Sequence, residues 1–324
     1  MAAANTYDTS SPGSASLNRE DLSDVLTRLE PQATPLFSLC GKSKAKSTTV
    51  EWGVDKLAAP NADGVSEGDD VSTFVNKAAD RARLSNYTQK FRRAWMVTDF
   101  QEAVDTAGVA SDIADAETKA MLEVKRDVEF AIASSNDKQQ EAGSGSPYKT
   151  RGLGDWIDSA GPSDVPSAYR TPAGSIKTGG ATFSEAQLDD LTTSVFSKTG
   201  TVNRSTIVAG TALRQAISNI SRTGVSATGV QYSVTEAAAS KKVTLEVKVF
   251  DGNHGLVNIV DGNPDCMASA NAGFLIHEGA MTWKSLKPIG SARLEDQGGG
   301  PRGIVDTIGA LCISHPQKFG KIST

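Results

Sequence analysis

The chain has 324 residues, 38% hydrophobic and 22% charged, so it can bury a core and is not disordered as a whole. Its formal net charge of −5 argues against a protein that mainly grips nucleic-acid phosphates, and gives no reason to expect membrane-surface binding. Three widely spaced cysteines, Cys40, Cys266 and Cys312, argue against a disulfide framework and indicate a reducing compartment.

The start of the chain shows almost no globular-core pattern. Residues 1–16 are rich in Ala, Ser, Thr and Gly and lack the basic and apolar regions of a signal peptide, so a flexible segment is expected. Leu17–Leu29 has the spacing of a short helix, and Pro31 and Pro35 then favour an extended path. No apolar run reaches the roughly 18 residues that a membrane span needs.

Residues 47–98 are predicted to form an extended two-stranded ribbon. Apolar and polar residues alternate over 47–57 and again over 84–98, and the loop between them is acidic. Two strands alone are marginal in water, so the ribbon needs another surface. We expect its aromatic row and its charges to contact a neighbouring subunit, through Trp52, Asp63, Glu67, Asp69, Asp70, Arg81, Arg83, Lys90, Phe91, Arg92, Arg93 and Trp95.

One long amphipathic helix is predicted near residues 111–134. Apolar residues recur there every three or four positions, and Ser111 or Asp112 can cap the first turn. The opposite face is charged, and we place Glu129 on it, paired with Lys125 one turn earlier. At about 1.5 Å per residue this helix is roughly 36 Å long.

Compact patterning begins only after a Gly-, Pro- and Ser-rich stretch over 148–180, which holds a small apolar group at Leu153, Trp156 and Ile157. The following pattern predicts helices at 184–197 and 211–221 and strands at 206–209, 243–250, 256–260, 273–288 and 291–314, with a Gly298–Gly303 loop.

No motif in the chain predicts catalytic, cofactor-binding or metal-ligating residues. The histidines, His254, His277 and His315, accompany no nucleophile signature. Cys312 and His315 have the spacing of half a zinc site, but no second pair complements them. The Gly298–Gly303 loop lacks the Gly-Lys-Ser/Thr of a phosphate-binding loop, and the acidic loop lacks the calcium pattern. We therefore expect no cofactor, although an enzyme whose site has no motif stays open.

The order of the parts is itself informative. About a hundred residues of arm and ribbon precede the long helix, and only then does a core begin. A chain that defers its core in this way is expected to lay its first part on other subunits, which indicates assembly.

Several stretches, in this order, resemble tailed-phage major capsid proteins of the Hong Kong 97 fold, in the branch called the SU10-type major head protein family. These stretches are Leu29–Lys42, Val50–Asp55, Trp95–Val104, Leu122–Glu129, Arg151–Gly154 and Leu311–Lys321. The resemblance covers about residues 20–324.

The resemblance implies an α+β fold of this capsid type. It implies an N-terminal arm over 1–46, an extended loop over 47–98, a peripheral domain from 99–184 and 266–324, and an axial domain over 185–265. The spine helix of the peripheral domain would be residues 111–134, and Gly298–Gly303 would lie near threefold contacts.

The implied function is a major capsid protein that self-assembles, as pentamers and hexamers, into the icosahedral head shell around the phage genome. Its implied partners are further copies of itself, a portal, a decoration protein, and double-stranded DNA enclosed without specific binding. The implied location is the virion, after assembly in the host cytoplasm.

Two departures from some relatives shape the expectations. Only about 45 residues precede the ribbon, so a separate scaffolding protein is expected. Lys77, Asn76 and Asn263 match no cross-linking pattern, so no covalent cross-link is expected. The alternatives are an encapsulin-like compartment shell, a tail or decoration protein, and an enzyme without a motif-encoded site.

Overall fold

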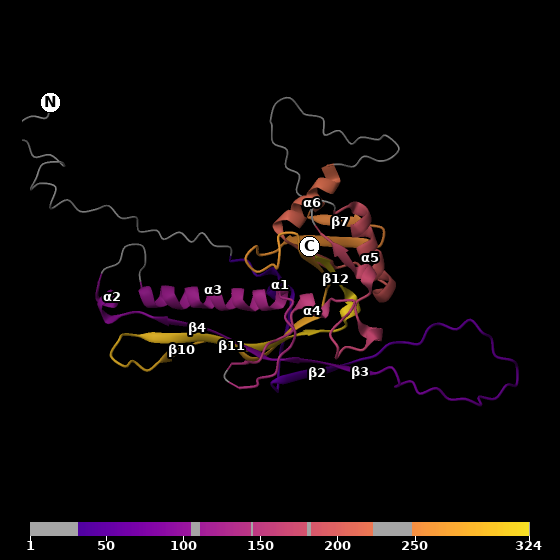
Figure 1. Ribbon diagram of the computed structural model, residues 1–324, viewed down its shortest axis with the longest axis horizontal. Coiled ribbons are helices and arrows are strands. Elements are labelled where there is room, and N and C mark those ends of the chain that lie inside the picture. The colour runs from indigo at the N-terminus through magenta and orange to yellow at the C-terminus, as the bar shows by residue number, and fades with distance from the viewer. Residues whose placement is uncertain (1–31, 105–110, 144, 180–182, 223–247, 324) are drawn as a thin grey trace, which may run out of the picture.

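The computed structural model describes residues 32–104, 111–143, 145–179, 183–222 and 248–323. It is a mixed helix and sheet structure with one elongated and one compact part, and a long loop projects from it (Figure 1). The flexible segment predicted for 1–16 and the helix predicted for Leu17–Leu29 lie outside the described residues.

The elongated part is a four-stranded sheet with one long helix along one face. Its strand order is β1-β10-β11-β4, with β1 parallel to β10 and the other pairs antiparallel. Helix α3 runs over β4 and β11 (Figure 1). The bounds are β1 Gly41–Lys44, β4 Gln89–Met96, α3 Asp112–Ala133, β10 Met281–Leu294 and β11 Arg302–Ile313.

Helix α3 confirms the long amphipathic helix predicted near residues 111–134. Ser111 is its N-cap, and the Ser111 hydroxyl accepts a hydrogen bond from the Ala114 N–H at 3.4 Å. Val124, Val128 and Ile132 are fully buried on one face, as the three-to-four-residue spacing predicts. Its 22 residues extend about 33 Å at 1.5 Å per residue. Three shorter helices are α1 Pro35–Leu39, α2 Asp99–Ala103 and α4 Leu153–Trp156.

The predicted ribbon is shorter than expected. Strand β2 (Thr49–Val54) pairs antiparallel with β3 (Ala82–Tyr87), but the return strand predicted over 84–98 divides at Thr88. There the Thr88 N–H donates to the Thr48 carbonyl at 2.8 Å, and the chain then enters β4 beside β11. The strand divides there because residues 89–96 bury one face beneath α3. The two-stranded ribbon alone has no surface that could bury this face.

The compact part is a six-stranded mixed sheet in the order β5-β12-β9-β6-β8-β7. Helices α5 and α6 cover one face, where Leu188, Leu191 and Leu213 pack on Ile207 and Leu275. The opposite face joins the core under α3. The bounds are β5 Ile176–Thr178, α5 Glu185–Thr199, β6 Ser205–Ala209, α6 Thr211–Arg222, β7 Val249–Gly252, β8 Gly255–Asp261, β9 Gly273–His277 and β12 Phe319–Ser323. Three short 3-10 helices are η2 Ser167–Tyr169, η3 Ala173–Ser175 and η4 Pro316–Lys318.

Most predicted elements of the compact part are confirmed, but its last strands divide differently. Helices α5 and α6 and strand β6 lie where predicted, and β8 follows the predicted turn; residues 243–247 of the strand before it lie outside the described residues. The bounds predicted for the strands at 273–288 and 291–314 are wrong, because this part of the chain forms three strands, β9, β10 and β11. The chain turns earlier, at Gly279 with φ 71°, and β10 continues through register shifts between Ser285 and Gly290, because a bulge bends a strand without ending it.

Candidate functional site

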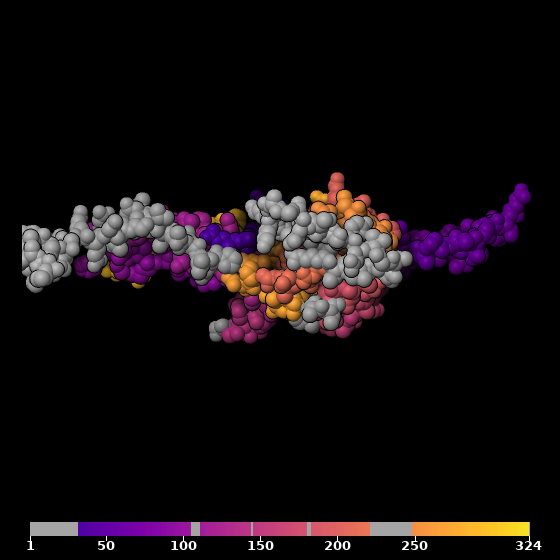
Figure 2. Space-filling model, turned by 90° about the horizontal axis from the view of Figure 1, so that it is seen from above, coloured from indigo at the N-terminus to yellow at the C-terminus, as the bar shows by residue number. Residues whose placement is uncertain are grey.

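Residues 55–81 form a loop that projects far from the rest of the subunit. Figure 1 shows it extending away from the ribbon β2–β3, and Figure 2 shows the same projection from above. Every residue from 55 to 81 is exposed. Five residues of the predicted contact set lie on this loop and are exposed, namely Asp63, Glu67, Asp69, Asp70 and Arg81.

The loop also carries large apolar side chains that the sequence interpretation did not single out. Leu57 is 94% exposed and Phe74 is 86% exposed, and three valines share this exposure. The described part of the subunit therefore buries none of the large apolar side chains of this loop. The sequence did contain a sign of this exposure, because these apolar residues stand among acidic residues without the regular alternation of a buried strand face. The full set is Leu57, Val65, Val71, Phe74 and Val75.

The base of the ribbon neutralises its own charges. The Arg81 guanidinium lies 3.2 Å from an Asp55 carboxylate oxygen, and Arg83 lies 3.1 Å from Glu51 across the two strands. Both predicted contact residues, Arg81 and Arg83, therefore already have partners within their own subunit. Such exposed pairs contribute only about 0–1 kcal/mol each.

A buried amide fixes the ribbon to the subunit. The Asn86 side chain is fully buried; its amide group donates to the Leu311 carbonyl at 2.6 Å, and its oxygen accepts from the Arg151 N–H at 2.8 Å. Beside it, the rings of Trp52 and Trp156 pack with their centroids 5.7 Å apart. Trp52, a predicted contact residue, is thus half-buried against its own subunit.

Strand β4 divides the remaining predicted residues between two faces of the four-stranded sheet. Phe91 and Trp95 point toward α3 and are each only 7% exposed, so the subunit itself buries them. Arg93 lies on that side as well and makes a two-pronged ion pair with Asp127 of α3, at 2.7 Å for both bonds. Phe91 and Trp95 therefore belong to the interior of the subunit, which corrects the expectation of a single outward aromatic row, whereas Arg93 stays exposed in its ion pair with Asp127.

The other face of the same sheet is open along one half. Lys90 and Arg92 lie there and are exposed, since side chains alternate between the faces of a strand. No described helix or strand covers this half, in which cationic and apolar side chains are mixed. We name it the open sheet face, defined by Lys90, Arg92, Ala94, Met96, Lys287, Ala292, Leu294, Arg302, Ile304 and Ile308.

One buried carboxylate organises the open sheet face. Asp306 is 2% exposed; Lys287 bonds to one of its oxygens, and Lys90 lies 3.6 Å from the other. Burial alone would raise the pKa of Asp306, but the hydrogen bond and the charge of Lys287, aided by Lys90, outweigh it and lower that pKa. The face is therefore cationic around one compensated acid.

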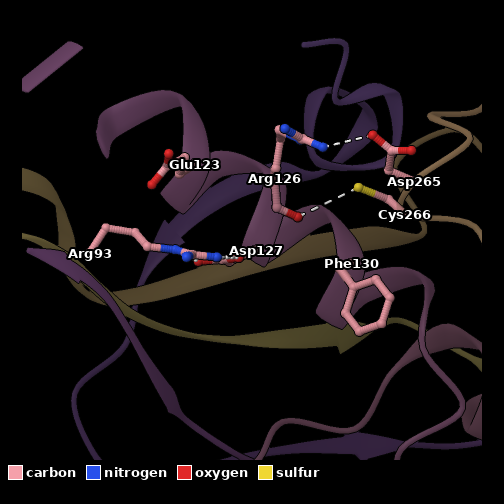
Figure 3. A pocket seen from close by; sticks show the side chains of 7 residues that line it. All are labelled: Arg93, Glu123, Arg126, Asp127, Phe130, Asp265 and Cys266. Atoms are coloured by element: carbon pink, nitrogen blue, oxygen red, sulfur yellow. Dashed lines mark hydrogen bonds and ion pairs between the residues drawn. The ribbon is translucent and has the colours of Figure 1, made fainter. Parts of the chain in front are cut away.

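A shallow depression of about 270 Å³ lies over the exposed side of α3 (Figure 3). Arg93 and Asp127 pair on one side of it, and Arg126 pairs with Asp265 at 2.7 Å on the other. Cys266 is its one thiol, and burial raises the pKa of Cys266 to about 11, which keeps it protonated. The arginines of this lining are thus paired with carboxylates, and its thiol is in the protonated form.

The prediction that Glu129 lies on the exposed face of the helix, paired with Lys125, is wrong. Glu129 is 1% exposed and does not face solvent beside Lys125. Its two carboxylate oxygens accept hydrogen bonds from the backbone N–H groups of Leu36 and Phe37, at 2.8 and 2.7 Å. Burial raises the pKa of Glu129 to about 7, despite these two bonds, which lower it. The residue joins the arm to α3.

Two of the three histidines contact hydroxyl groups of their own subunit. His254 bonds to the Thr193 hydroxyl at 3.0 Å and stacks on Phe196, while His277 lies 3.2 Å from the hydroxyl of Ser205, which is fully buried. In the ranges that the structure describes, no group of three His, Cys, Asp or Glu residues could hold a metal ion. No helix in those ranges is both long and apolar enough to cross a membrane.

Comparisons with known proteins agree on one kind of protein. The sequence profile of the SU10 major capsid protein matches residues 4–324. Among solved structures, the chain is similar to the capsid of cyanophage A-1(L), with TM-score 0.65 and 13% identity over 95% of this chain and 97% of that one. The capsid of a native GTA particle has a TM-score of 0.62 and 12% identity, over 98% of this chain and 99% of that one. The capsid of cyanophage P-SCSP1u has a TM-score of 0.58 and 11% identity, over 98% of this chain and 95% of that one. Among curated proteins, none matches the chain.

Proposed function

The chain belongs to the SU10 major capsid protein family and is a shell-forming capsid protein, and we propose that its projecting loops join neighbouring subunits within pentamers and hexamers of an icosahedral phage head. The observation that carries this proposal is the loop over 55–81, which exposes five large apolar side chains that the described part of its own subunit leaves uncovered. A second copy can cover them.

We infer the Hong Kong 97 arrangement for this fold. The described arm residues 32–46, the long helix α3 and the four-stranded sheet are consistent with it, and we assign the six-stranded sheet with α5 and α6 to an axial domain. Strand β4 pairs with β11, so the extended loop of this proposal ends near Thr88 and not at residue 98. Strands β9 and β12, from the predicted peripheral range 266–324, complete the sheet of the axial domain.

The receiving surface in this proposal is the open sheet face of the neighbouring copy. Between residues 57 and 80 the loop has five acidic residues and one basic residue, Lys77. The open sheet face presents four cations, Lys90, Arg92, Lys287 and Arg302, around the single acid Asp306. The acidic loop of one copy therefore contacts the cationic face of the next. Met96 and Leu294 of that face are exposed, so the apolar side chains of the loop can pack against them.

The apolar contacts are proposed to provide most of the affinity. Fully burying one large apolar side chain contributes about 1.5–3 kcal/mol, whereas an exposed ion pair contributes about 0–1 kcal/mol. Leu57, Phe74 and Val75 thus replace Phe91 and Trp95 as the expected anchors, since the latter are already buried. The charges select the partner and the register of the contact.

The further partners follow from the shell. A protein with net charge −5 can enclose double-stranded DNA without binding it tightly, which suits non-specific enclosure of a genome. A portal, a separate scaffolding protein, a decoration protein, assembly in the host cytoplasm and a non-enzymatic role all belong to this proposal. Neither an encapsulin-like compartment nor a catalytic role is supported by any site described above.

Electron microscopy of the purified full-length protein tests the proposal, with a candidate scaffolding protein added where the chain alone stays unassembled. The expected result is closed shells, or discrete pentamers and hexamers. A protein that remains a monomer or dimer under all these conditions would contradict it.

A further inference from the structure

The structure holds the arm against the subunit at three places. The Asn263 side chain donates to the Ala33 carbonyl at 2.8 Å, and strand β1 pairs with β10. Between these two attachments, the short helix α1 lies on α3, with Leu36 fully buried. The third attachment is the pair of hydrogen bonds from Leu36 and Phe37 to Glu129. We call this third attachment the arm clasp.

The arm clasp has an unusual charge environment. Its carboxyl group is buried, and no described Lys, Arg or His forms an ion pair with it. The titratable groups that face it are the thiols of Cys40, from the arm, and Cys266, from the loop after β8. Burial raises the pKa of both thiols, so both are neutral near pH 7.

Two cations of the elements that carry the arm clasp, Arg126 of α3 and Lys42 of β1, have other partners. Arg126, one turn earlier on α3, is paired with Asp265 at 2.7 Å. Lys42, on β1, lies over the Phe37 ring with its ammonium 5.0 Å from the centroid. A carboxylate at Glu129 is therefore stabilised mainly by two backbone N–H groups, against the cost of removing its charge from water.

We propose that Glu129 links arm attachment to proton uptake, so that the arm is held more tightly against α3 as the solution becomes more acidic. The inference goes beyond shell formation and depends only on contacts within one subunit. It can therefore fail while the proposed shell function holds, and the reverse is also possible.

The sign follows from the two states of the carboxyl group. With the arm attached, burial raises the pKa of Glu129 to about 7; with α1 lifted away, the group meets water and its pKa returns toward the ordinary 4.5. The attached state therefore binds the proton more strongly between these values. Attachment is expected to strengthen about 70-fold from pH 8 to pH 5, and to change little above pH 8 or below about pH 4.

Hydrogen–deuterium exchange of the full-length protein tests this. The measured quantity is the protection factor of a peptide over residues 33–40, which contains the two amides bonded to Glu129. Dividing each rate by the intrinsic exchange rate removes the ordinary pH dependence of exchange. The wild-type protection factor should rise about 70-fold from pH 8 to pH 5. In Glu129→Gln, whose amide does not titrate, it should stay constant within about threefold.

The matched control is Glu123→Gln, which makes the same change on the same helix, away from the arm. It should retain the wild-type rise, and core strand β6 serves in every sample as an internal reference for global unfolding. Should Glu129→Gln fail to fold, the wild-type titration decides alone. A flat wild-type profile, or an undiminished rise in a folded Glu129→Gln protein, would overturn the proposal.

Discussion

Asn86 of the ribbon donates its side-chain amide to the Leu311 carbonyl of β11 at 2.6 Å, with both residues buried. This contact joins positions 225 apart in the sequence and sets where the ribbon leaves the sheet. The same side chain accepts from the Arg151 N–H at 2.8 Å. The direction of the loop over 55–81 is thus fixed at its base, and a subunit can present the loop in a reproducible position.

Replacing Asn86 with Ala is expected to destabilise the fold. The change leaves the Leu311 carbonyl and the Arg151 N–H without these partners in the interior, at a cost of about 1–3 kcal/mol for each unsatisfied group. Urea unfolding should show a lower midpoint with little change in slope. Asn76→Ala, the same substitution on the exposed loop, should leave the free energy of unfolding within about 0.5 kcal/mol of wild type.

The arrangement also separates two kinds of aromatic residue. Phe74 is 86% exposed on the loop, whereas Trp95 is 7% exposed beneath α3. Phe74→Ser is expected to leave the free energy of unfolding of the subunit nearly unchanged and to weaken shells, as seen by electron microscopy and sedimentation. A large loss of subunit stability in Phe74→Ser would show that the loop packs on its own subunit.

Trp95→Ala should behave in the opposite way. Removing a buried indole ring costs about 3–5 kcal/mol through lost burial and the cavity left behind. Chemical unfolding of the unassembled protein should show this loss directly. An unchanged midpoint would contradict the placement of Trp95 in the core beneath α3.

These residues also show how far the sequence alone could lead. Spacing every three or four residues predicted α3 correctly, because a helix buries a face that its own sequence defines. Alternation at Phe91 and Trp95 predicted that one face of the strand is buried, but not what buries it. That depended on α3, which follows later in the chain, and the pattern therefore fitted a neighbouring subunit equally well.

Glu129 shows the same limit for the candidate sites. Lys125 one turn earlier gave it a plausible local partner, whereas its actual partners, Leu36 and Phe37, lie 93 and 92 positions away. Local spacing cannot report such a contact. In contrast, the acidic loop residues were placed correctly as exposed, because a run of charges, Gly and Pro without alternation has no face to bury.

Charge reversal tests the proposed meeting of the loop with the open sheet face. Replacing Glu67, Asp69 and Asp70 together with Lys should prevent or slow shell formation, because the loop would then face Lys90 and Arg92 with like charge. Adding Arg92→Glu and Arg302→Glu should restore part of the assembly; Lys90 is left unchanged because it offsets the buried charge of Asp306. Electron microscopy with light scattering measures both the yield and the rate.

The matched control for the rescue is Lys125→Glu on the exposed side of α3, combined with the same reversed loop. It changes the net charge in the same direction without touching the open sheet face, so it should not restore assembly. Equal rescue by both combinations would mean that overall charge, and not this contact, governs assembly.

Asp306 makes the stability of the open sheet face depend on pH. Lys287 and Lys90 hold the pKa of this buried carboxyl below its ordinary 3.8. A depressed pKa in the folded state means that the stabilisation is present above about pH 3.8 and is lost as the pH falls through the lower, folded value. Urea unfolding of the wild type should therefore show that the free energy of unfolding falls below about pH 4, and part of this fall should be absent in Asp306→Asn.

At pH 7 the free energy of unfolding of Asp306→Asn should be about 1–3 kcal/mol lower than that of the wild type, because two lysines lose their buried counter-charge. If the two proteins follow the same pH profile, Asp306 is not the titrating group, and the charge balance proposed for the open sheet face is wrong.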